Sequence, residues 1–309
     1  VLQVLTYIGI ILFLIMVVSK IIKIATAPVH LRWELYPVPH EKGKSHYGGS
    51  RLEEDGWWEK PIKKSLFDEF KAMGAEIIFL KAVWEHNRSL WLGSFPFHFA
   101  LYMLFTNVIL LALAGVVTLT GGTISPAEFN LGGILYYAVT IIAWVGSILG
   151  LAGAVRMYFL RIVEPGLRNF SSPSHYFNIL LIGAIYLTLL MWLIMDPNFA
   201  PRTSGYYAGL MTFTHSGNMP AIAVWHICLI VFFLIYMPMT HMTHFFAKYF
   251  TYHHVRWEDA PNMSGTKMRQ KLSEQLNLKV TWAAPHIGAD GTKTWVALAT
   301  TNPWEKKDE

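Results

Sequence analysis

Residues 225–246 read WHICLIVFFLIYMPMTHMTHFF, an apolar stretch with a histidine close to each end. His226 and His244 are eighteen positions apart. That is five whole turns at about 3.6 residues per turn, so one continuous helix would carry both imidazoles on the same face. A rise of about 1.5 Å per residue separates them by roughly 27 Å, close to the ~30 Å hydrocarbon core of a bilayer. The stretch therefore predicts a transmembrane helix with one histidine near each membrane surface.

The composition of the whole chain is typical of a membrane protein. Of its 309 residues, 53% are hydrophobic and only 15% are charged, which is outside the range of ordinary soluble proteins. We expect an all-α integral membrane protein with five transmembrane helices, the first of them a retained anchor and not a cleaved signal peptide. The apolar stretches long enough to span cover about residues 2–25, 97–119, 133–155, 176–195 and 221–247.

The basic residues predict how the chain crosses the membrane. With these five spans, 24 of the 25 Lys and Arg residues fall on one side, and Arg202 alone falls on the other. The positive-inside rule then places the N-terminus outside and the C-terminus in the cytoplasm, as in a multi-pass protein of the cytoplasmic membrane. This orientation accounts for the net charge of +5, so we predict no nucleic-acid partner. The single cysteine, Cys228, excludes an iron–sulfur cluster held by cysteines of this chain alone.

Three regions follow the first span. Residues 26–95 form a predicted cytoplasmic loop, in which apolar residues recur at three- and four-residue steps from about 65 to 88. This pattern predicts an amphipathic helix that lies on lipid headgroups or against a partner. Residues 96–247 form the bundle of spans two to five, and residues 248–309 form a cytoplasmic tail, helical over 267–276 and otherwise extended. The tail has too few clustered apolar residues for a core, and docking onto another protein is expected to order it.

Histidines within the spans are the candidate ligands, and they make the bundle a predicted haem-binding region. Ionisable side chains at this depth are costly, and a pair of buried imidazoles most often holds haem iron. His98, at the cytoplasmic end of the second span, lies at the depth predicted for His244, so these two are expected to ligate one six-coordinate haem. His241 competes with His244, but its position is about 60° from the face of His226. His226 is expected to hold a second haem near the outer surface.

The second span offers no clear partner for His226. Where a second ligand is expected, the chain reads Thr106, Asn107 and Val108, none of them an ordinary haem ligand. Three alternatives stay open: His215 folds in from the outer loop between spans four and five, the outer haem is five-coordinate, or the chain binds one haem. For any single histidine, a hydrogen-bonded structural role is the competing interpretation.

Several segments resemble known families. The helix with His226, Pro238 and His244 resembles the corresponding helix of the cytochrome b (gamma) subunit of respiratory nitrate reductases, and His98 falls on a ligand position of that family. A second resemblance, to the membrane subunit of heterodisulfide-reductase-like menaquinol-oxidising complexes (the Dsr and Hme complexes of sulfate-reducing microbes), covers nearly the whole chain. Four segments carry it: RWELYPVPHEKG (32–43), YGGS (47–50), LEEDGWWEKP (52–61) and WAAPHIGADG (282–291).

The resemblance implies a five-helix diheme cytochrome b, with haem b as cofactor and menaquinone as substrate. It also implies electron transfer from menaquinol to a cytoplasmic iron–sulfur subunit of the heterodisulfide-reductase type. This chain and the iron–sulfur subunit would both belong to a respiratory complex of sulfur metabolism with further membrane and periplasmic subunits. Val108 departs from the nitrate reductase pattern, which has its fourth histidine there, whereas His98, His226 and His244 match it. Two rival functions are a membrane anchor without redox centres and an ion transporter that uses the histidines as relays.

Overall fold

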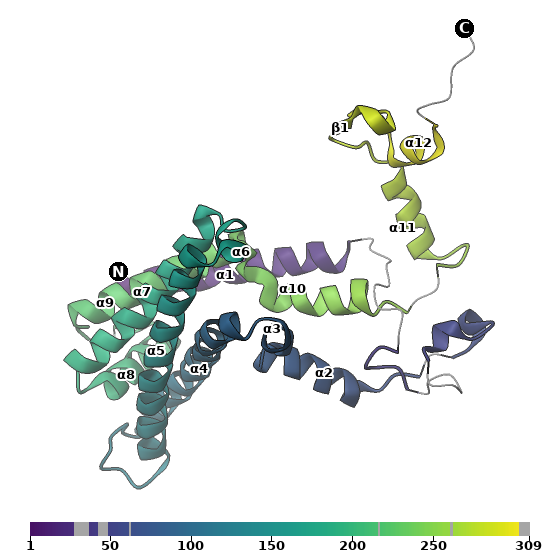
Figure 1. Ribbon diagram of the computed structural model, residues 1–309. Helices are drawn as coiled ribbons and strands as arrows, with labels where there is room; N and C mark the ends of the chain where they lie inside the picture. Colours follow the sequence, from purple (N-terminus) through teal and green to yellow (C-terminus); the bar gives the residue numbers. More distant parts are fainter. Residues whose placement is uncertain (28–36, 43–48, 62, 216, 260–261, 303–309) are drawn as a thin grey trace. The chain divides into compact units, whose positions relative to one another are not determined.

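The computed structural model describes residues 1–27, 37–42, 49–61, 63–215, 217–259 and 262–302. These residues are mostly helical, and five helices among them are long and apolar enough to cross a membrane. The prediction of an α-helical membrane protein with five spans is thereby confirmed. The spans are α1 (Leu2–Ala25), α4 (Arg88–Leu119), α5 (Leu131–Val163), α7 (Pro173–Met195), and α9 (Ala221–Tyr236) with the 3₁₀ turn Met237–Met239 (Figure 1). Of the sequence motifs, residues 32–36, 43, 47 and 48 lie outside the described residues.

The chain divides into two compact units. Unit 1 comprises Val1–Met16 and Phe70–Thr240, and it holds most of the membrane-spanning helices. Unit 2 comprises Val17–Glu69 and His241–Glu309. Two of the boundaries fall inside helices, namely α1 and α2 (Leu66–Ile78).

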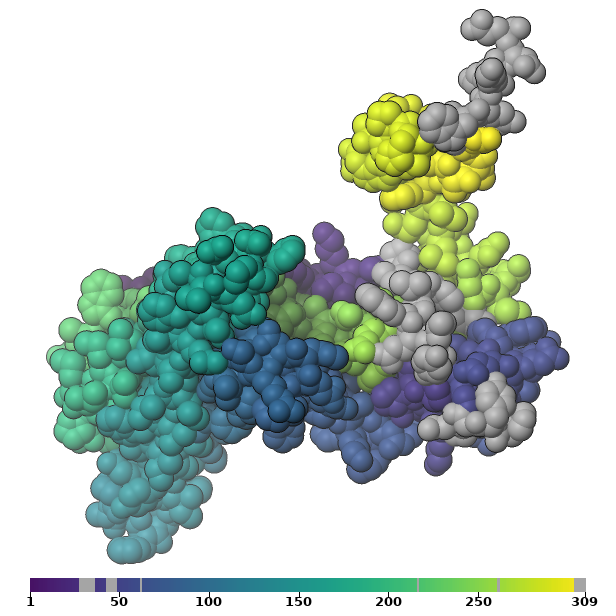
Figure 2. All heavy atoms as spheres, viewed as in Figure 1, coloured from purple at the N-terminus to yellow at the C-terminus, as the bar shows by residue number. Residues whose placement is uncertain are grey.

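In unit 1 the spans α4, α5, α7 and α9 pack one on the next in chain order. α4 and α5 form a hairpin, α5 packs on α7, and α7 packs on α9. Figure 2 shows α4 and α5 in contact on the visible face. The single turn α6 (Pro165–Arg168) precedes α7, and α8 (Phe199–Thr212) follows it and packs on α4. The segment of residues 196–220, predicted as a loop, is therefore largely helical.

The close approach of α5 to its neighbours depends on two glycines. A Cβ on Gly153 would lie 2.6 Å from the backbone nitrogen of Phe97, and a Cβ on Gly150 would overlap the ring of Tyr186. Tyr186 is fully buried, and its hydroxyl donates a hydrogen bond to the Phe97 carbonyl over 3.0 Å. At this level of the bundle, α4, α5 and α7 are therefore in mutual contact.

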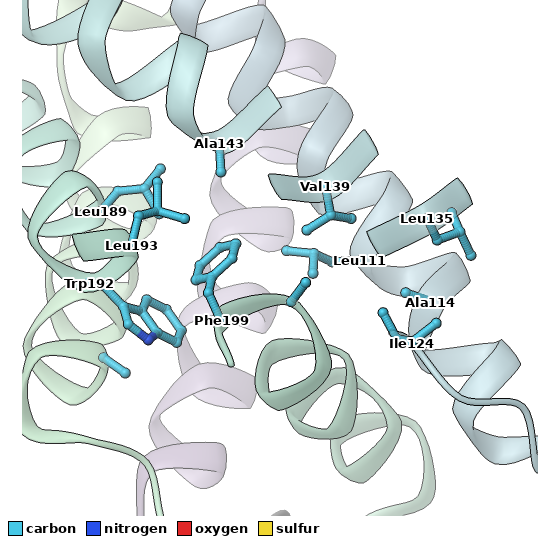
Figure 3. Close-up of a cluster of buried hydrophobic side chains, with 12 residues drawn as sticks. Leu111, Ala114, Ile124, Leu135, Val139, Ala143, Leu189, Trp192, Leu193 and Phe199 are labelled. Atoms are coloured by element: carbon cyan, nitrogen blue, oxygen red, sulfur yellow. The ribbon is translucent and has the colours of Figure 1, made fainter. Parts of the chain in front are cut away.

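The apolar core of unit 1 lies where α4, α5, α7 and α8 meet (Figure 3). Phe199, the first residue of α8, forms an edge-on ring pair with Trp192 of α7, with centroids 4.9 Å apart. This pair anchors α8 to the bundle. The buried members of the core are Leu111, Ala114, Ile124, Leu135, Val139, Ala143, Leu189, Trp192, Leu193, Phe199, Ala200 and Ala223.

The amino-terminal part of α1 belongs to the same bundle. Thr6 Oγ1 and the Tyr206 hydroxyl oxygen of α8 are 2.7 Å apart. Gly9 lies against α9, where an added Cβ would be 2.9 Å from Val231 Cγ1. The first span is therefore packed against α8 and α9 through its residues in unit 1.

The predicted amphipathic helix of residues 65–88 is interrupted. It forms α2 and the short α3 (Lys81–His86), which are separated at Leu80, where φ is a left-handed 52°. The Trp91 indole donates to the Phe79 carbonyl over 2.8 Å and so satisfies a group that the break leaves without a helical partner. α4 then begins nine residues before the predicted start of the second span.

The fifth span is shorter than the helix predicted over residues 221–247. α9 ends at Tyr236, and after the 3₁₀ turn the backbone at Thr240 is extended, with φ −113° and ψ 179°. Pro238 accounts for this ending, because its ring carries no N–H and clashes with the carbonyl four residues earlier. The prediction that a single helix covers residues 221–247 is wrong.

Beyond this interruption the chain enters unit 2. It forms a 3₁₀ turn over His241–Thr243 and then α10 (His244–Phe250), which passes into a π-helix over Thr251–Arg256. His226 and His244 therefore lie on different helices. The count of five whole turns between them does not place both rings on one face.

A buried ionic cluster in unit 2 joins two segments that are 219 residues apart in sequence. His40 Nε2 lies 2.6 Å from Asp259 Oδ2, and Lys64 Nζ lies 3.5 Å from the same oxygen. Arg51 Nη2 donates to the Asp259 carbonyl over 3.5 Å, and the His40 ring packs edge-on against Trp257. The side chains of His40 and Asp259 are only 3% and 2% exposed. These five residues form the His40–Asp259 cluster, which fastens the loop before α2 to the segment after the π-helix.

The carboxyl-terminal tail has more structure than predicted. α11 covers Lys267–Leu276, which confirms the helix predicted there. After it, β1 (Ala283–Ala284) pairs antiparallel with β2 (Ala289–Asp290), and α12 (Trp295–Thr300) follows. Gly288, with φ 72°, permits the tight turn between the strands. The prediction that the remainder of the tail is extended is therefore wrong.

Candidate functional site

His226 is a buried imidazole near the start of α9. Its Nδ1 lies 3.0 Å from the Thr188 hydroxyl of α7, and its ring lies against Trp192, with centroids 5.8 Å apart. The Thr188 hydroxyl donates its own proton to the Ala184 carbonyl over 2.8 Å, so it accepts from His226 Nδ1–H. In the neutral ring Nε2 then carries the lone pair, which is the form that binds a metal through Nε2.

His98 is half-buried in α4 and has its proton on the same ring nitrogen. Its Nδ1 lies 2.7 Å from the Ser94 carbonyl oxygen and 3.2 Å from the Ser94 hydroxyl. Because a carbonyl oxygen only accepts, Nδ1 is the donor. Metal-ligating histidines almost always donate their second ring N–H to a carboxylate, a carbonyl or water. The hydrogen bond of His98 to Ser94 follows this rule, and that of His226 to Thr188 uses a hydroxyl oxygen in the same role.

The remaining candidates are exposed. His244, at the start of α10 in unit 2, donates from Nδ1 to the His241 carbonyl over 3.2 Å. His215 lies in the segment between α8 and α9. The pairing of His98 with His244 joins the two units, so it stays a prediction, as does the preference for His244 over His241.

The helices that carry His98 and His226 are both hydrogen-bonded to α7. Tyr186 of α7 bonds to the carbonyl of Phe97, the residue before His98, and Thr188 of α7 bonds to His226. Tyr186 and Thr188 are two residues apart, which is an axial rise of about 3 Å. The placement of His98 near the inner surface and of His226 near the outer surface stays a prediction.

Four polar side chains of the bundle have a buried atom without a hydrogen-bond partner among the described residues. They are Asn107 of α4, through Oδ1, Thr140 and Arg161 of α5, through Oγ1 and Nε, and Asn178 of α7, through Nδ2. Asn107 is only 4% exposed, and an unpaired buried acceptor is costly. Asn107 is therefore a candidate contact for a bound hydrogen-bond donor. Sequence reasoning excluded it because an amide is not an ordinary iron ligand.

The end of α7 carries a second polar group of note, the carboxylate of Asp196. It accepts hydrogen bonds from Arg202 Nε at 2.7 Å, from Trp192 Nε1 at 3.2 Å and from the Asn198 backbone at 3.0 Å. Burial raises the pKa of Asp196, whereas these hydrogen bonds and the charge of Arg202 lower it. The lowering is the larger effect, so the pKa of Asp196 lies below its ordinary value. Trp192 thus contacts both this ion pair and the ring of His226.

The described residues contain no cluster of three or more His, Cys, Asp or Glu side chains that could hold a metal ion. Haem requires less of the protein, because the porphyrin supplies four iron ligands and the chain supplies only the axial ones. His98 and His226, with their Nδ1 protons bonded to Ser94 and Thr188, have the donor chemistry that an axial ligand needs.

Fold and composition define the class of protein, which is a multi-pass α-helical membrane protein. Comparison with protein-family models, curated proteins and solved structures finds no match for this chain. Any narrower function therefore rests on the residue motifs and on the geometry of the histidines.

Proposed function

We propose that this chain is a membrane cytochrome b that carries electrons from menaquinol to a cytoplasmic iron–sulfur subunit of the heterodisulfide-reductase type. The observation that supports this most is the buried imidazole of His226, which lies within an apolar bundle with its Nδ1 proton bonded to Thr188. A titratable ring at such depth is costly unless it serves a function. His98, held by Ser94 in the same way, supplies a second ligand candidate.

Each part of the proposed site has a distinct role. Two haems b supply the one-electron chemistry, and the chain supplies ligands, burial and orientation. His98, His226 and His244 are the proposed iron ligands, and His215 is a proposed further contact of the outer haem. Thr188 keeps the proton of His226 on Nδ1 and thereby fixes the orientation of the ring.

The proposed orientation puts the N-terminus outside and the C-terminus in the cytoplasm, because the basic residues gather on that side of the spans. The cytoplasmic loop and tail would then provide the surface for the iron–sulfur subunit. The His40–Asp259 cluster supports this proposal, since it gives the loop and tail a fixed common structure. Further membrane and periplasmic subunits, in the cytoplasmic membrane, would complete the complex.

A membrane anchor without redox centres is the second candidate, and one observation favours it. The ring of His226 is enclosed by side chains of α7, and the core beside it is filled by apolar residues (Figure 3). In an anchor, His226 would act only as a hydrogen-bond donor that ties α9 to α7.

An optical spectrum distinguishes the two candidates. The full chain is purified with its partner subunits from haem-replete cells, and spectra are recorded before and after reduction with dithionite. We expect sharp b-type α-bands and about two haems per chain. A featureless difference spectrum from a properly assembled complex would contradict the cytochrome and support the anchor.

A further inference from the structure

The corner where α5 passes through α6 into α7 is held by hydrogen bonds between its segments (Figure 1). Arg161, in the last turn of α5, donates from Nη1 to the Ser171 hydroxyl over 2.8 Å. The Tyr176 hydroxyl of α7 donates to the Arg161 carbonyl over 2.8 Å, and the Ser171 hydroxyl donates to the Leu167 carbonyl of α6 over 2.7 Å. The guanidinium of Arg161 is therefore fixed at one end of the bundle, unlike a side chain that only snorkels to the membrane surface.

This guanidinium has a charge and donors that the described residues do not satisfy. Its Nε is buried without a hydrogen-bond partner among them. None of their carboxylates lies within ion-pair distance of Arg161, not even that of Glu164 three positions on, and the same holds for the exposed Arg168 of α6. A charge beside the low-dielectric interior of a bilayer is costly unless an opposite charge lies next to it. The corner therefore carries two positive charges that an anion from outside the chain would neutralise.

The side chains around the two arginines indicate their depth in the bilayer. Phe170, which precedes Ser171, is 84% exposed, and Val163 at the end of α5 is 71% exposed. Exposed apolar side chains at the end of a span are positioned to contact acyl chains. Tyr158 and Tyr176 form an edge-on pair with ring centroids 5.7 Å apart, and tyrosine is enriched at the membrane–water interface. The arginines therefore lie at the level of lipid headgroups, next to apolar side chains that acyl chains can cover.

We propose that Arg161 and Arg168 bind the phosphate of an anionic phospholipid, whose acyl chains cover Val163 and Phe170. The Ser171 backbone N–H donates to the Arg168 carbonyl over 3.1 Å, so both arginines flank the same serine. Arg161 is only part-buried and Arg168 is exposed, so a headgroup can reach both from the membrane surface. Guanidinium groups match the geometry of phosphate oxygens. The apolar neighbours favour a lipid over free phosphate, which has no apolar part.

Lipid binding to the full chain tests this site. The chain is purified in detergent and titrated with phosphatidylglycerol or with phosphatidylcholine of the same acyl chains, and native mass spectrometry counts the bound lipid. We expect the wild type to prefer phosphatidylglycerol. Arg161→Gln should lower this preference about fivefold, the factor that one basic residue typically contributes beside anionic lipid.

Arg156→Gln is the matched control, because it makes the same change on the same helix. The Arg156 guanidinium lies elsewhere, since it donates from Nη2 to the Ser89 carbonyl of α4 over 3.1 Å. This variant should keep the wild-type preference for phosphatidylglycerol.

A second variant covers the case in which Arg161→Gln fails to fold. The side chain of Arg168 is exposed and makes no hydrogen bond or ion pair with a described residue. Arg168→Gln should therefore unfold at the wild-type temperature, and it too should lower the preference for phosphatidylglycerol about fivefold.

Three results would overturn the phospholipid site. They are a wild type without preference for phosphatidylglycerol, an equal loss in Arg156→Gln, and displacement of the lipid by inorganic phosphate but not by chloride at the same ionic strength. The last result would indicate a site for the free anion. Loss of a haem band in Arg161→Gln with unchanged lipid preference would also overturn it. The site does not rest on the proposed function: the expected preference in a chain without haem would support the site and contradict only the cytochrome.

Discussion

The hydroxyl of Thr188 makes two hydrogen bonds, one accepted from His226 Nδ1 and one donated to the Ala184 carbonyl. Thr188→Val keeps the shape of the side chain but removes the acceptor. Loss of such a supporting partner typically weakens a metal site 10–100-fold. We expect haem to leave the variant about that much faster, measured by transfer to apomyoglobin. Thr188→Ser should restore retention, and a valine variant that holds haem like the wild type would contradict this role.

Asp196 predicts a pH dependence of stability. A carboxyl group whose folded pKa is lowered stabilises the folded state above its unfolded pKa of about 3.9, and this contribution disappears as the pH falls through the folded value. We expect Asp196→Asn to cost about 1.5–3 kcal/mol near neutral pH, because charged hydrogen bonds to Arg202 and Trp192 are lost. Below about pH 4 the difference from the wild type should shrink.

Thermal unfolding in detergent between pH 3 and pH 7 measures the effect of Asp196→Asn. Asp55→Asn, at an exposed turn, is the control and should leave the melting temperature unchanged at every pH. A constant difference between Asp196→Asn and the wild type over the whole range would exclude ionisation of Asp196 as the cause.

The partners of the two histidines differ in how far the sequence could predict them. Ser94 is four residues before His98, one helical turn away, so its hydrogen bond follows from local helix geometry. Thr188 is 38 residues from His226, and their contact depends on how α7 packs against α9. Nothing in the periodicity of either span contains that information.

Among the elements, α5 offers the sharpest test of packing. Gly150 has no room for a Cβ, because the buried ring of Tyr186 occupies that space. Overpacking of this kind typically costs 1–3 kcal/mol, so we expect Gly150→Ala to lower the thermal unfolding temperature in detergent. Gly183→Ala on α7 is the matched control, since its Cβ would make an ordinary 3.4 Å contact with Ala154. Equal stability of the two variants would argue against tight packing at Gly150.

The elements also show where hydropathy predicts structure and where it does not. All five spans follow from apolar length, because a bilayer core demands about 20 apolar residues from a helix. Apolar length does not predict α8, because its 14 residues include Arg202, Gly205 and Gly209. This helix is stabilised by the packing of Phe199 and its neighbours into the core. The end of α9 was not predicted, because the apolar stretch continues to about residue 247, and Pro238 explains that ending only once the structure is known.

At the scale of the whole molecule, the His40–Asp259 cluster predicts that unit 2 depends on one carboxylate. Asp259→Ala removes the partner of His40 and Lys64 and leaves a buried imidazole without its hydrogen bond. Breaking a buried pair in this way costs about 3–5 kcal/mol. We expect trypsin to cleave the full chain within residues 37–64 faster in this variant than in the wild type, as measured by mass spectrometry. The thermal unfolding of unit 1 should be unchanged.

The control for this prediction is Glu85→Gln. It removes the pair of Lys81 and Glu85, both more than half exposed, and such surface pairs contribute little. Cleavage of Asp259→Ala at the rate of this control would mean that the cluster does not hold the loop.

The division into two units was only partly foreseeable. The apolar bundle and the polar loop and tail differ in composition, so a membrane part and a flanking part follow from the sequence. The tail was expected to be extended outside residues 267–276, yet β1, β2 and α12 form through local turns such as the one at Gly288. Contacts between His40 and Asp259 span too much sequence for any local pattern to reveal them.

The extended residue Thr240 has a mechanical consequence. An uninterrupted α-helix behaves as a stiff rod, because each turn is tied to the next by hydrogen bonds, and a twist at one end reaches the other. Where that ladder stops after Tyr236, the two soft dihedral angles of Thr240 take up such a twist instead. A twist that a docking partner of the tail applies to α10 is therefore taken up by rotation at Thr240 and is not transmitted to the ring of His226.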